Sequence, residues 1–349
     1  MTNTLRFTAA AIAALSLAAC GGSDSSGTGQ RDAVRVVGSS TVYPFAKVVA
    51  ENFARSYPEL GSPVIESTGS GAGIALFCAG VGPDTPDIVN ASRRMKASEL
   101  ETCNANGVDS VTEIQVGLDG IAFASAIGGI DMNLSPEIVY RAIAAAPYGE
   151  AQTAKNWSDL DPSLPAKPIL VYGPPATSGT RDALTELVLM AGCESGEGMA
   201  AIEEDDEDRF EQLCTELRTD GAYVEQGEQD NLIVQKIEGN PDAVGIFGYS
   251  YLEENIDRVH GLTMNGVEPT YENISSFDYI GARPLFIYVK GQHLDAIQGM
   301  REFIDEWAVS WNAGGPLAAI GLVPNPQDVM VKTTAAAKDL PALTASELE

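Results

Sequence analysis

Three short segments of this 349-residue sequence combine small residues with hydroxyl groups where a strand is expected to give way to a helix. They are GSSTVYP (38–44), STGSGAG (67–73) and ATSGTR (176–181). Each would direct backbone N–H groups, the positive end of a helix dipole and nearby hydroxyls toward one point, which suits a phosphate-like anion. One such segment alone is more often an ordinary helix cap. The prediction of an anion site therefore rests on finding three.

A fourth segment, NASRR (90–94), adds a serine at the expected end of a strand and two consecutive arginines. A guanidinium group presents paired N–H donors that match the paired oxygens of an oxyanion. Ligands of open α/β sheets bind beyond the carboxyl ends of the strands, where all four segments are expected. The four segments together predict one anion site built from several strand ends.

The elements that must position these segments follow from the hydrophobic pattern. Short apolar runs alternate with stretches of helical periodicity, with strands expected at 34–38, 63–68, 120–127, 168–173 and 283–291. This alternation predicts an α/β fold with parallel-rich sheets flanked by helices. The chain length favours two lobes over one. The acidic run at 203–208 is expected to be the solvated start of a helix, because acidic side chains stabilise a helix N-terminus.

The net charge of -28, from 49 acidic and 21 basic residues, limits the classes of partner. An acidic surface repels nucleic acid and anionic membranes, so neither is an expected partner. It does not exclude an anionic ligand. Exposed charges are screened over about 8 Å at physiological salt, whereas donors inside a closed cleft act at contact distance.

The first 20 residues are expected to be an export signal. Arg6 precedes an apolar stretch (7–19), and LAAC (17–20) favours lipidation of Cys20, with plain secretory cleavage nearby as the alternative. Residues 21–32 would then be a flexible tether. No later segment has 18 consecutive apolar residues. We expect a protein of the periplasm or cell envelope that is anchored to a membrane through Cys20.

Four further cysteines make disulfides plausible in an exported protein. Three pairings are possible, and we favour pairing of sequence neighbours, which closes short loops. The predicted disulfides join Cys78 to Cys103 and Cys193 to Cys214. A metal site is disfavoured because the chain has no CxxC spacing and two histidines in all. We expect neither a metal nor a cofactor.

Nucleotide binding and hydrolysis are weaker predictions. The glycines of STGSGAG do not form GxGxxG, and GxxxxGK[ST] is absent from the sequence. A hydrolase could use Ser40, Ser70 or Ser178 as its nucleophile, but it would need a nearby base. His260 and His293 lie in sequence contexts that suggest surface residues. The sequence therefore favours a binding protein over an enzyme.

The order GSSTVYPF, STGSGAGI, NASRRM, VGLDGIAF, TSGTRDAL and GIFGYSYLEEN resembles the periplasmic phosphate-binding proteins of ABC transporters, over about residues 34–324. The resemblance implies a type II periplasmic-binding-protein fold, monomeric, with a ligand cleft between two lobes. One lobe would combine 33–126 with 281–349, and the other would be 127–280. Inorganic phosphate would be the ligand and membrane permease subunits the partners. Another oxyanion (sulfate, molybdate or arsenate) and a role in phosphate sensing remain alternatives.

The resemblance assigns ligand contacts residue by residue. The matching positions are Ser40, Thr41, Val42, Ser70, Gly71, Ser92, Ser178, Gly179 and Thr180. The chain departs from the family at two positions. Arg93 stands where many members have an aspartate, and Pro174 stands where many have an arginine.

These departures leave the charges of the site to other residues. We expect Arg93 and Arg181 to supply positive charge. Asp119 is the candidate for a relocated carboxylate, although a turn aspartate that caps its own loop is an equal alternative. Near neutral pH phosphate keeps a proton, so a buried carboxylate would accept a hydrogen bond from it, whereas the same carboxylate would repel sulfate.

Overall fold

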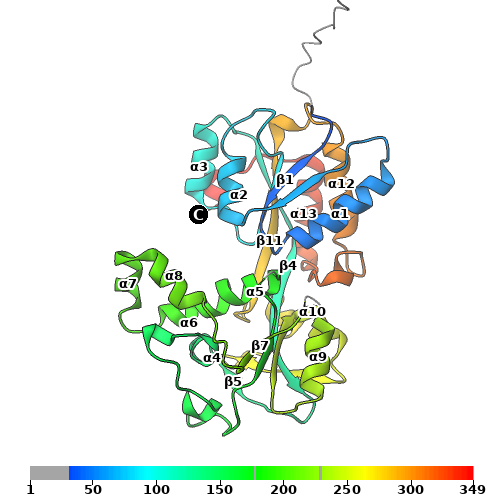
Figure 1. Cartoon of the computed structure of the whole chain (residues 1–349). Coiled ribbons are helices and arrows are strands. Elements are labelled where there is room, and N and C mark those ends of the chain that lie inside the picture. The colour runs from blue at the N-terminus through cyan, green and yellow to red at the C-terminus, as the bar shows by residue number, and fades with distance from the viewer. Residues whose placement is uncertain (1–30, 177, 228–229, 349) are drawn as a thin grey trace, which may run out of the picture.

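The computed structural model describes residues 31–176, 178–227 and 230–348. Within these ranges the chain forms two α/β halves, an upper and a lower half in the view of Figure 1, which are joined by two long strands. The predictions for Cys20, the signal segment 1–20 and most of the tether lie outside the described residues. No helix of the described residues is long and apolar enough to cross a bilayer.

The upper half is a sheet with the strand order β2-β1-β3-β11-β4. The first three strands run parallel, and the last two run antiparallel to their neighbours. The strands are β1 (Arg35–Gly38), β2 (Val64–Ser67), β3 (Ile88–Ala91), β11 (Ala282–Lys290) and β4 (Val111–Ala126). Alternate side chains of these strands enter two different cores. Val36 and Ile287 belong to one core, whereas Val37 and Phe286 belong to the other.

Helices cover both faces of this sheet. The amphipathic helices α1 and α12 bury Phe53 and Trp307 in the core on one face, which α13 also contacts. The short helices α2 and α3 bury Phe77 and Leu100 on the opposite face. The bounds are α1 (Tyr43–Ser56), α2 (Ser70–Phe77), α3 (Ala97–Ala105), α12 (Met300–Ser310) and α13 (Gln327–Asp339).

The lower half continues the sheet from the second part of β4. There β4 pairs with β8 and β9, and β6 and β7 follow in parallel. The strands are β6 (Val171–Gly173), β7 (Tyr223–Glu225), β8 (Val244–Gly248) and β9 (Val259–Gly261), with a small separate pair β5 (Asn133–Leu134) and β10 (Thr263–Met264).

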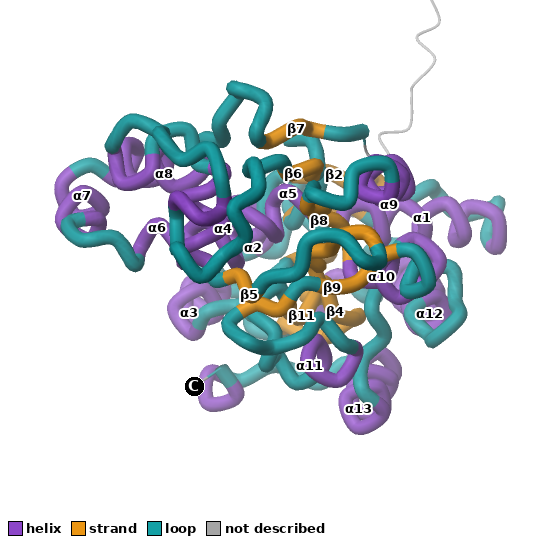
Figure 2. Tube along the Cα trace, turned by 90° about the horizontal axis from the view of Figure 1, so that it is seen from below, coloured by secondary structure: helices purple, strands orange, loops and turns teal. Residues whose placement is uncertain are grey.

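Most helices of the lower half lie on two sides of its sheet. Figure 2 shows α7 and α8 projecting on one side and α9 and α10 on the other. The bounds are α4 (Pro136–Ile143), α5 (Gly179–Leu184), α6 (Met190–Glu194), α7 (Met199–Asp205), α8 (Glu207–Thr215), α9 (Asp230–Glu238), α10 (Tyr249–Glu254) and α11 (Tyr271–Ser275).

The strands β4 and β11 connect the halves and make the sheet mixed. The first part of β4 pairs with β11, and the part from Ile121 onward pairs with β8 and β9. Because the chain leaves the upper half along β4 and returns along β11, these two strands must run in opposite directions. The predicted α/β class is confirmed, with a mixed sheet in place of a purely parallel one. The strand predicted at 120–127 is the second part of β4.

Both predicted disulfides are confirmed. Cys78 at the end of α2 is bonded to Cys103 in α3, and Cys193 in α6 is bonded to Cys214 in α8. They close loops with sequence separations of 25 and 21 residues. By restricting the unfolded chain, closures of this length contribute about 3 kcal/mol each to stability. The second disulfide fastens α8 to the body of the lower half.

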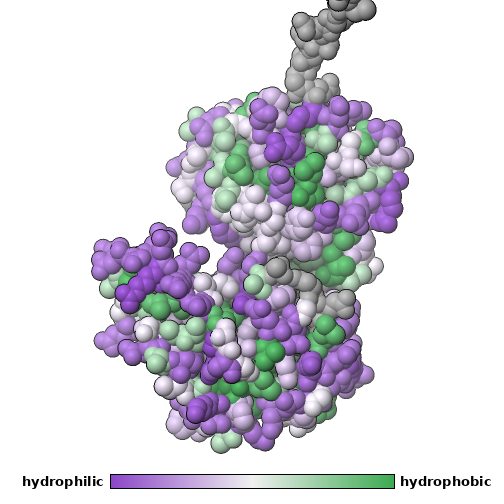
Figure 3. Space-filling model, viewed as in Figure 1, coloured by the Kyte–Doolittle hydropathy of each residue, from purple (hydrophilic) through white to green (hydrophobic). Residues whose placement is uncertain are grey.

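The acidic run at 203–208 crosses the boundary between two helices. It ends α7 at Asp205 and begins α8, where the Asp206 side chain accepts a hydrogen bond from the Arg209 N–H group at 3.0 Å. The expectation of a solvated helix start therefore holds for α8, while the first residues of the run lie at the end of α7. Figure 3 shows a strongly hydrophilic surface over α7 and α8, which together are called the α7–α8 arm.

Candidate ligand-binding site

A cleft of about 210 Å³ lies where the upper and lower halves meet. It takes in the loop after β1, the middle of β4, the start of α5 and the start of α10. Five of the residues predicted for the site line it. The lining residues are Thr41, Pro44, Phe45, Asp119, Ser178, Gly179, Thr180, Gly248, Tyr251, Ile320 and Gly321.

The lower half contributes the start of α5. Ser178 is the N-cap, and its Oγ accepts a hydrogen bond from the Thr180 N–H group at 3.2 Å. Gly179 faces the upper half across the cleft. A Cβ atom there would lie 2.8 Å from the Thr41 Cα, closer than real Cβ contacts allow. Glycine at this position therefore lets the start of α5 approach the first loop of the upper half.

The upper half contributes the loop between β1 and α1. Thr41 is 5% exposed, and its Oγ1 accepts a hydrogen bond from Arg283 Nη2 at 2.7 Å. Ser40 reaches across the junction and donates its hydroxyl to the carboxylate of Asp182, which follows Arg181 in α5. Val42 is buried and is the N-cap of α1. The loop thus places one hydroxyl in the cleft and another against the lower half.

Arg283 is a candidate site residue that the sequence analysis missed. It lies near the start of β11, opposite Asp119 of β4 in the antiparallel register, and is 5% exposed. Its Nε lies 3.2 Å from Asp119 Oδ2, and its Nη1 donates to the Glu186 carboxylate. The available signal was a charged residue at the start of the otherwise apolar strand RPLFIYV. This guanidinium lies beside the cleft, whereas Arg93 and Arg181 were expected from the sequence to supply the positive charge there.

Asp119 is a strand residue and not a turn residue, because β4 continues through it. Its side chain is 14% exposed. Burial raises the pKa of Asp119 above the ordinary value for an aspartate, while Arg283 opposes that rise and the Asp182 charge adds to it. The site therefore holds a carboxyl group that is easier to protonate than usual, next to a fixed guanidinium.

Four other predicted residues gather in the upper half but do not line this cleft. Ser70 begins α2, and its Oγ accepts a hydrogen bond from the Ser92 N–H group at 3.1 Å. A Cβ atom at Gly71 would lie 3.8 Å from Arg93 Nη2. Arg93 donates two hydrogen bonds to Glu99, at 2.9 and 2.7 Å, and the pairing raises the pKa of Arg93. The Arg93 guanidinium is thus bound to a carboxylate, and its role as a ligand contact stays a prediction.

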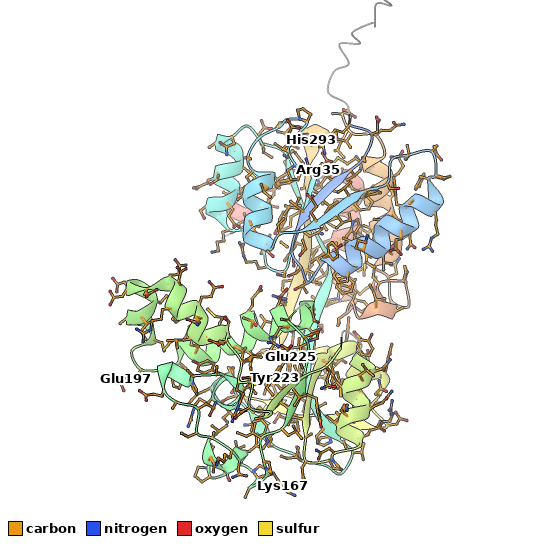
Figure 4. The ribbon with its side chains drawn as sticks, in the orientation of Figure 1. Arg35, Lys167, Glu197, Tyr223, Glu225 and His293 are labelled. Atoms are coloured by element: carbon orange, nitrogen blue, oxygen red, sulfur yellow. A yellow bond between two sulfur atoms is a disulfide. The ribbon has the colours of Figure 1, made fainter. Side chains whose placement is uncertain are left out.

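Arg181 is also occupied by protein groups. Its Nη1 donates to the Pro174 carbonyl and to the Tyr223 hydroxyl, each at 2.8 Å, and its Nη2 lies 3.0 Å from Glu225. The guanidinium carbon is 5.1 Å from the Tyr223 ring centroid. Figure 4 labels Tyr223 and Glu225 side by side in the lower half. To contact a ligand, Arg181 would have to exchange these partners.

Two α/β halves joined by two long strands, with a polar cleft at their junction, define a protein that holds a small ligand between its halves. Residues 23–310 match the PBP superfamily domain, and the chain belongs to that superfamily. The resemblance noted from the sequence motifs is thereby confirmed.

The relatives cover most of the chain. Protein SphX of Synechococcus elongatus is 30% identical over 313 residues, which are 87% of this chain and 81% of the relative. The phosphate-binding protein PstS of Staphylococcus haemolyticus is 30% identical over 305 residues, covering 84% and 83%. A possible phosphate binding protein from Planctomyces limnophilus has a similar crystal structure, with a TM-score of 0.71, 26% identity and coverage of 88% and 98%.

Proposed function

We propose that this protein binds inorganic phosphate in the cleft between its halves and delivers it to the permease of an ABC transporter. The observation that carries the proposal is the meeting of Arg283, the Thr41 hydroxyl and the start of α5 at one cleft, in a chain whose relatives are named phosphate-binding proteins. We expect binding without catalysis. The two histidines support this, because each side chain contacts protein groups away from the cleft.

The number of donors is sufficient for useful affinity. Micromolar binding requires about 8 kcal/mol. Hydrogen bonds to a charged group contribute roughly 1.5–3 kcal/mol each, so five or six donors reach that value after ordering costs. Arg283, the Thr41 and Ser178 hydroxyls and the first N–H groups of α5 are the candidate donors. The loops with Ser70 and Ser92 would add to them when the halves close on the ligand.

Asp119 is the proposed basis of selectivity for phosphate. Hydrogen phosphate can donate a hydrogen bond to a carboxylate through its O–H group, whereas sulfate has no O–H group. A sulfate ion would therefore face Asp119 as two unpaired negative charges in a buried site. Arsenate has the same protonation as phosphate, so this mechanism does not discriminate against it. A binding protein for another oxyanion is the second candidate if Asp119 does not face the ligand.

The organisation of the chain completes the proposal. The lobes would be 33–126 with 281–349 and 127–280, and lobe closure would trap the ligand. Cys20 would carry a lipid that anchors a monomeric protein to a membrane, outside the cytoplasm. Arg31, 2.5 Å from the buried Asp87, would fix the end of the tether to the upper lobe.

Isothermal titration of a lipid-free form beginning at residue 21 tests the proposal, after bound anion has been removed. We expect micromolar or tighter binding of phosphate and little binding of sulfate at neutral pH. Equal affinity for both anions would favour the second candidate. Failure to bind phosphate, sulfate or arsenate would overturn the proposed function.

A further inference from the structure

We propose that Glu186 is an internal anion that occupies Arg283 when the cleft holds no ligand, and that phosphate must displace it. This inference rests on the proposed function and names a residue that lowers affinity. The Glu186 carboxylate accepts a hydrogen bond from Arg283 Nη1, and this contact joins the lower half to the strand β11.

The local helix geometry brings Glu186 to this position. It lies in the π-helical segment Thr185–Leu189, which directly follows α5 and precedes α6. An inserted π turn changes the direction of side chains along a helix, and such turns occur frequently at functional sites. Asp182, one turn earlier, contacts Ser40 of the upper half. Two carboxylates of this helical stretch, Asp182 and Glu186, thus contact polar groups beyond the lower half, and the Glu186 partner Arg283 lies beside the cleft.

The charges show which group must give way to the ligand. Arg283 carries one positive charge, and it already contacts the carboxylates of Asp119 and Glu186. An entering phosphate adds further negative charge, so one carboxylate must move away or take up a proton. Asp119 is held in β4 opposite Arg283, and its side chain is 14% exposed. The Glu186 side chain is 54% exposed and can turn into solvent at little cost.

The contact also gives the buried guanidinium a second carboxylate partner beside Asp119. Removing a partner from a buried charge is costly because the remaining charge is poorly solvated. Asp119 approaches Arg283 on one side, and Glu186 approaches the guanidinium on another. When phosphate arrives, it replaces the one contact that reaches across from the other half. Ligand binding is therefore an exchange of one anion for another at Arg283.

The test compares Glu186→Gln with the wild-type protein by titration with phosphate and with sulfate. Because the variant loses a competing anion, we expect both anions to bind roughly three- to tenfold more tightly. Asp242→Asn is the matched control. Asp242 is 50% exposed and pairs with Lys167 at 2.9 Å, and Figure 4 shows Lys167 at the far end of the lower half. This control should leave both affinities unchanged.

One alternative gives the opposite result. If Glu186 accepted a hydrogen bond from the O–H group of phosphate, the glutamine variant would bind phosphate more weakly and sulfate more tightly. That outcome, or unchanged affinities with an intact fold, would overturn the inference. Thermal denaturation verifies that each variant is folded.

The titrations also separate this inference from the proposed function. Wild-type protein that bound no phosphate would refute the proposed function. Wild-type protein that bound phosphate, with an unchanged affinity in Glu186→Gln, would refute only the role of Glu186.

Discussion

Replacement of Arg283 by methionine should abolish useful phosphate binding and destabilise the fold in a pH-dependent way. The guanidinium donates to Thr41 and Asp119 and is the cation beside the cleft described above. A ligand contact by a charged donor contributes roughly 1.5–3 kcal/mol per hydrogen bond. If two such bonds are lost, the cost is at least about 3 kcal/mol, so the dissociation constant should rise by about 100-fold or more.

The effect on stability follows from Asp119. Breaking a buried ion pair by removing one partner typically costs about 3–5 kcal/mol, because a charge is left unpaired. Burial already raises the pKa of Asp119, and loss of Arg283 should raise it further. A carboxyl group with a raised folded-state pKa favours the folded protein below its unfolded-state pKa of about 3.9, and that advantage is lost as the pH rises through the folded-state value. Arg283→Met should therefore be more destabilised at pH 7.5 than at pH 4.

The assay pairs titration of phosphate with thermal denaturation at both pH values. The double variant Arg283→Met/Asp119→Asn provides the control. It removes the unpaired charge, so it should recover most of the stability at pH 7.5 without recovering phosphate binding. Wild-type affinity in a folded Arg283→Met protein would refute the placement of Arg283 in the site. Equal stability losses at the two pH values would refute the account of Asp119.

Three further outcomes are expected. Asp119→Asn should bind phosphate more weakly and sulfate no worse than the wild type, and unchanged selectivity in parallel titrations would remove Asp119 from the site. In Gly179→Ala the new Cβ atom would lie 2.8 Å from the Thr41 Cα. This variant should bind phosphate at least tenfold more weakly, while its melting temperature changes little. Normal affinity would show that the halves do not meet here in the bound state. Burial lowers the pKa of Lys290 to about 8, so the neutral amine is favoured in the folded state and stability should rise between about pH 8 and pH 10. Lys290→Met should lack that rise in urea denaturation, and an identical pH profile would show that Lys290 does not cause it.

The sequence predicts most of the elements that carry dense apolar patterns. The strands β1 and β11 and both disulfides were expected close to their observed positions. The first part of β4 was missed because Thr112, Glu113 and Gln115 interrupt its apolar residues. Two of these side chains find partners in the folded protein: Glu113 pairs with Arg94 at 2.7 Å, and Gln115 donates a hydrogen bond to Asn325 at 2.8 Å.

The site was harder to predict than the fold, because its charges are paired by tertiary structure. The start of α5 and the loop with Thr41, both singled out from local motifs, line one cleft in the structure. Arg283 contacts Asp119 across 164 positions of sequence, and only the register of β11 on β4 brings them together. No local pattern encodes that register. The same holds for Arg181, whose partner Glu225 is 44 positions away in the sequence.

The two connecting strands give the site a mechanical property. If the halves turn about β4 and β11, the Arg283–Asp119 pair lies on the axis of rotation and hardly moves. The α7–α8 arm lies far from that axis and would sweep through the largest arc (Figure 1). In such a rotation the displacement grows with distance from the axis, so a small adjustment around the anion would give a larger displacement at α7 and α8. The Cys193–Cys214 disulfide joins α8 to α6, so α8 should move together with the rest of the lower half during such a rotation.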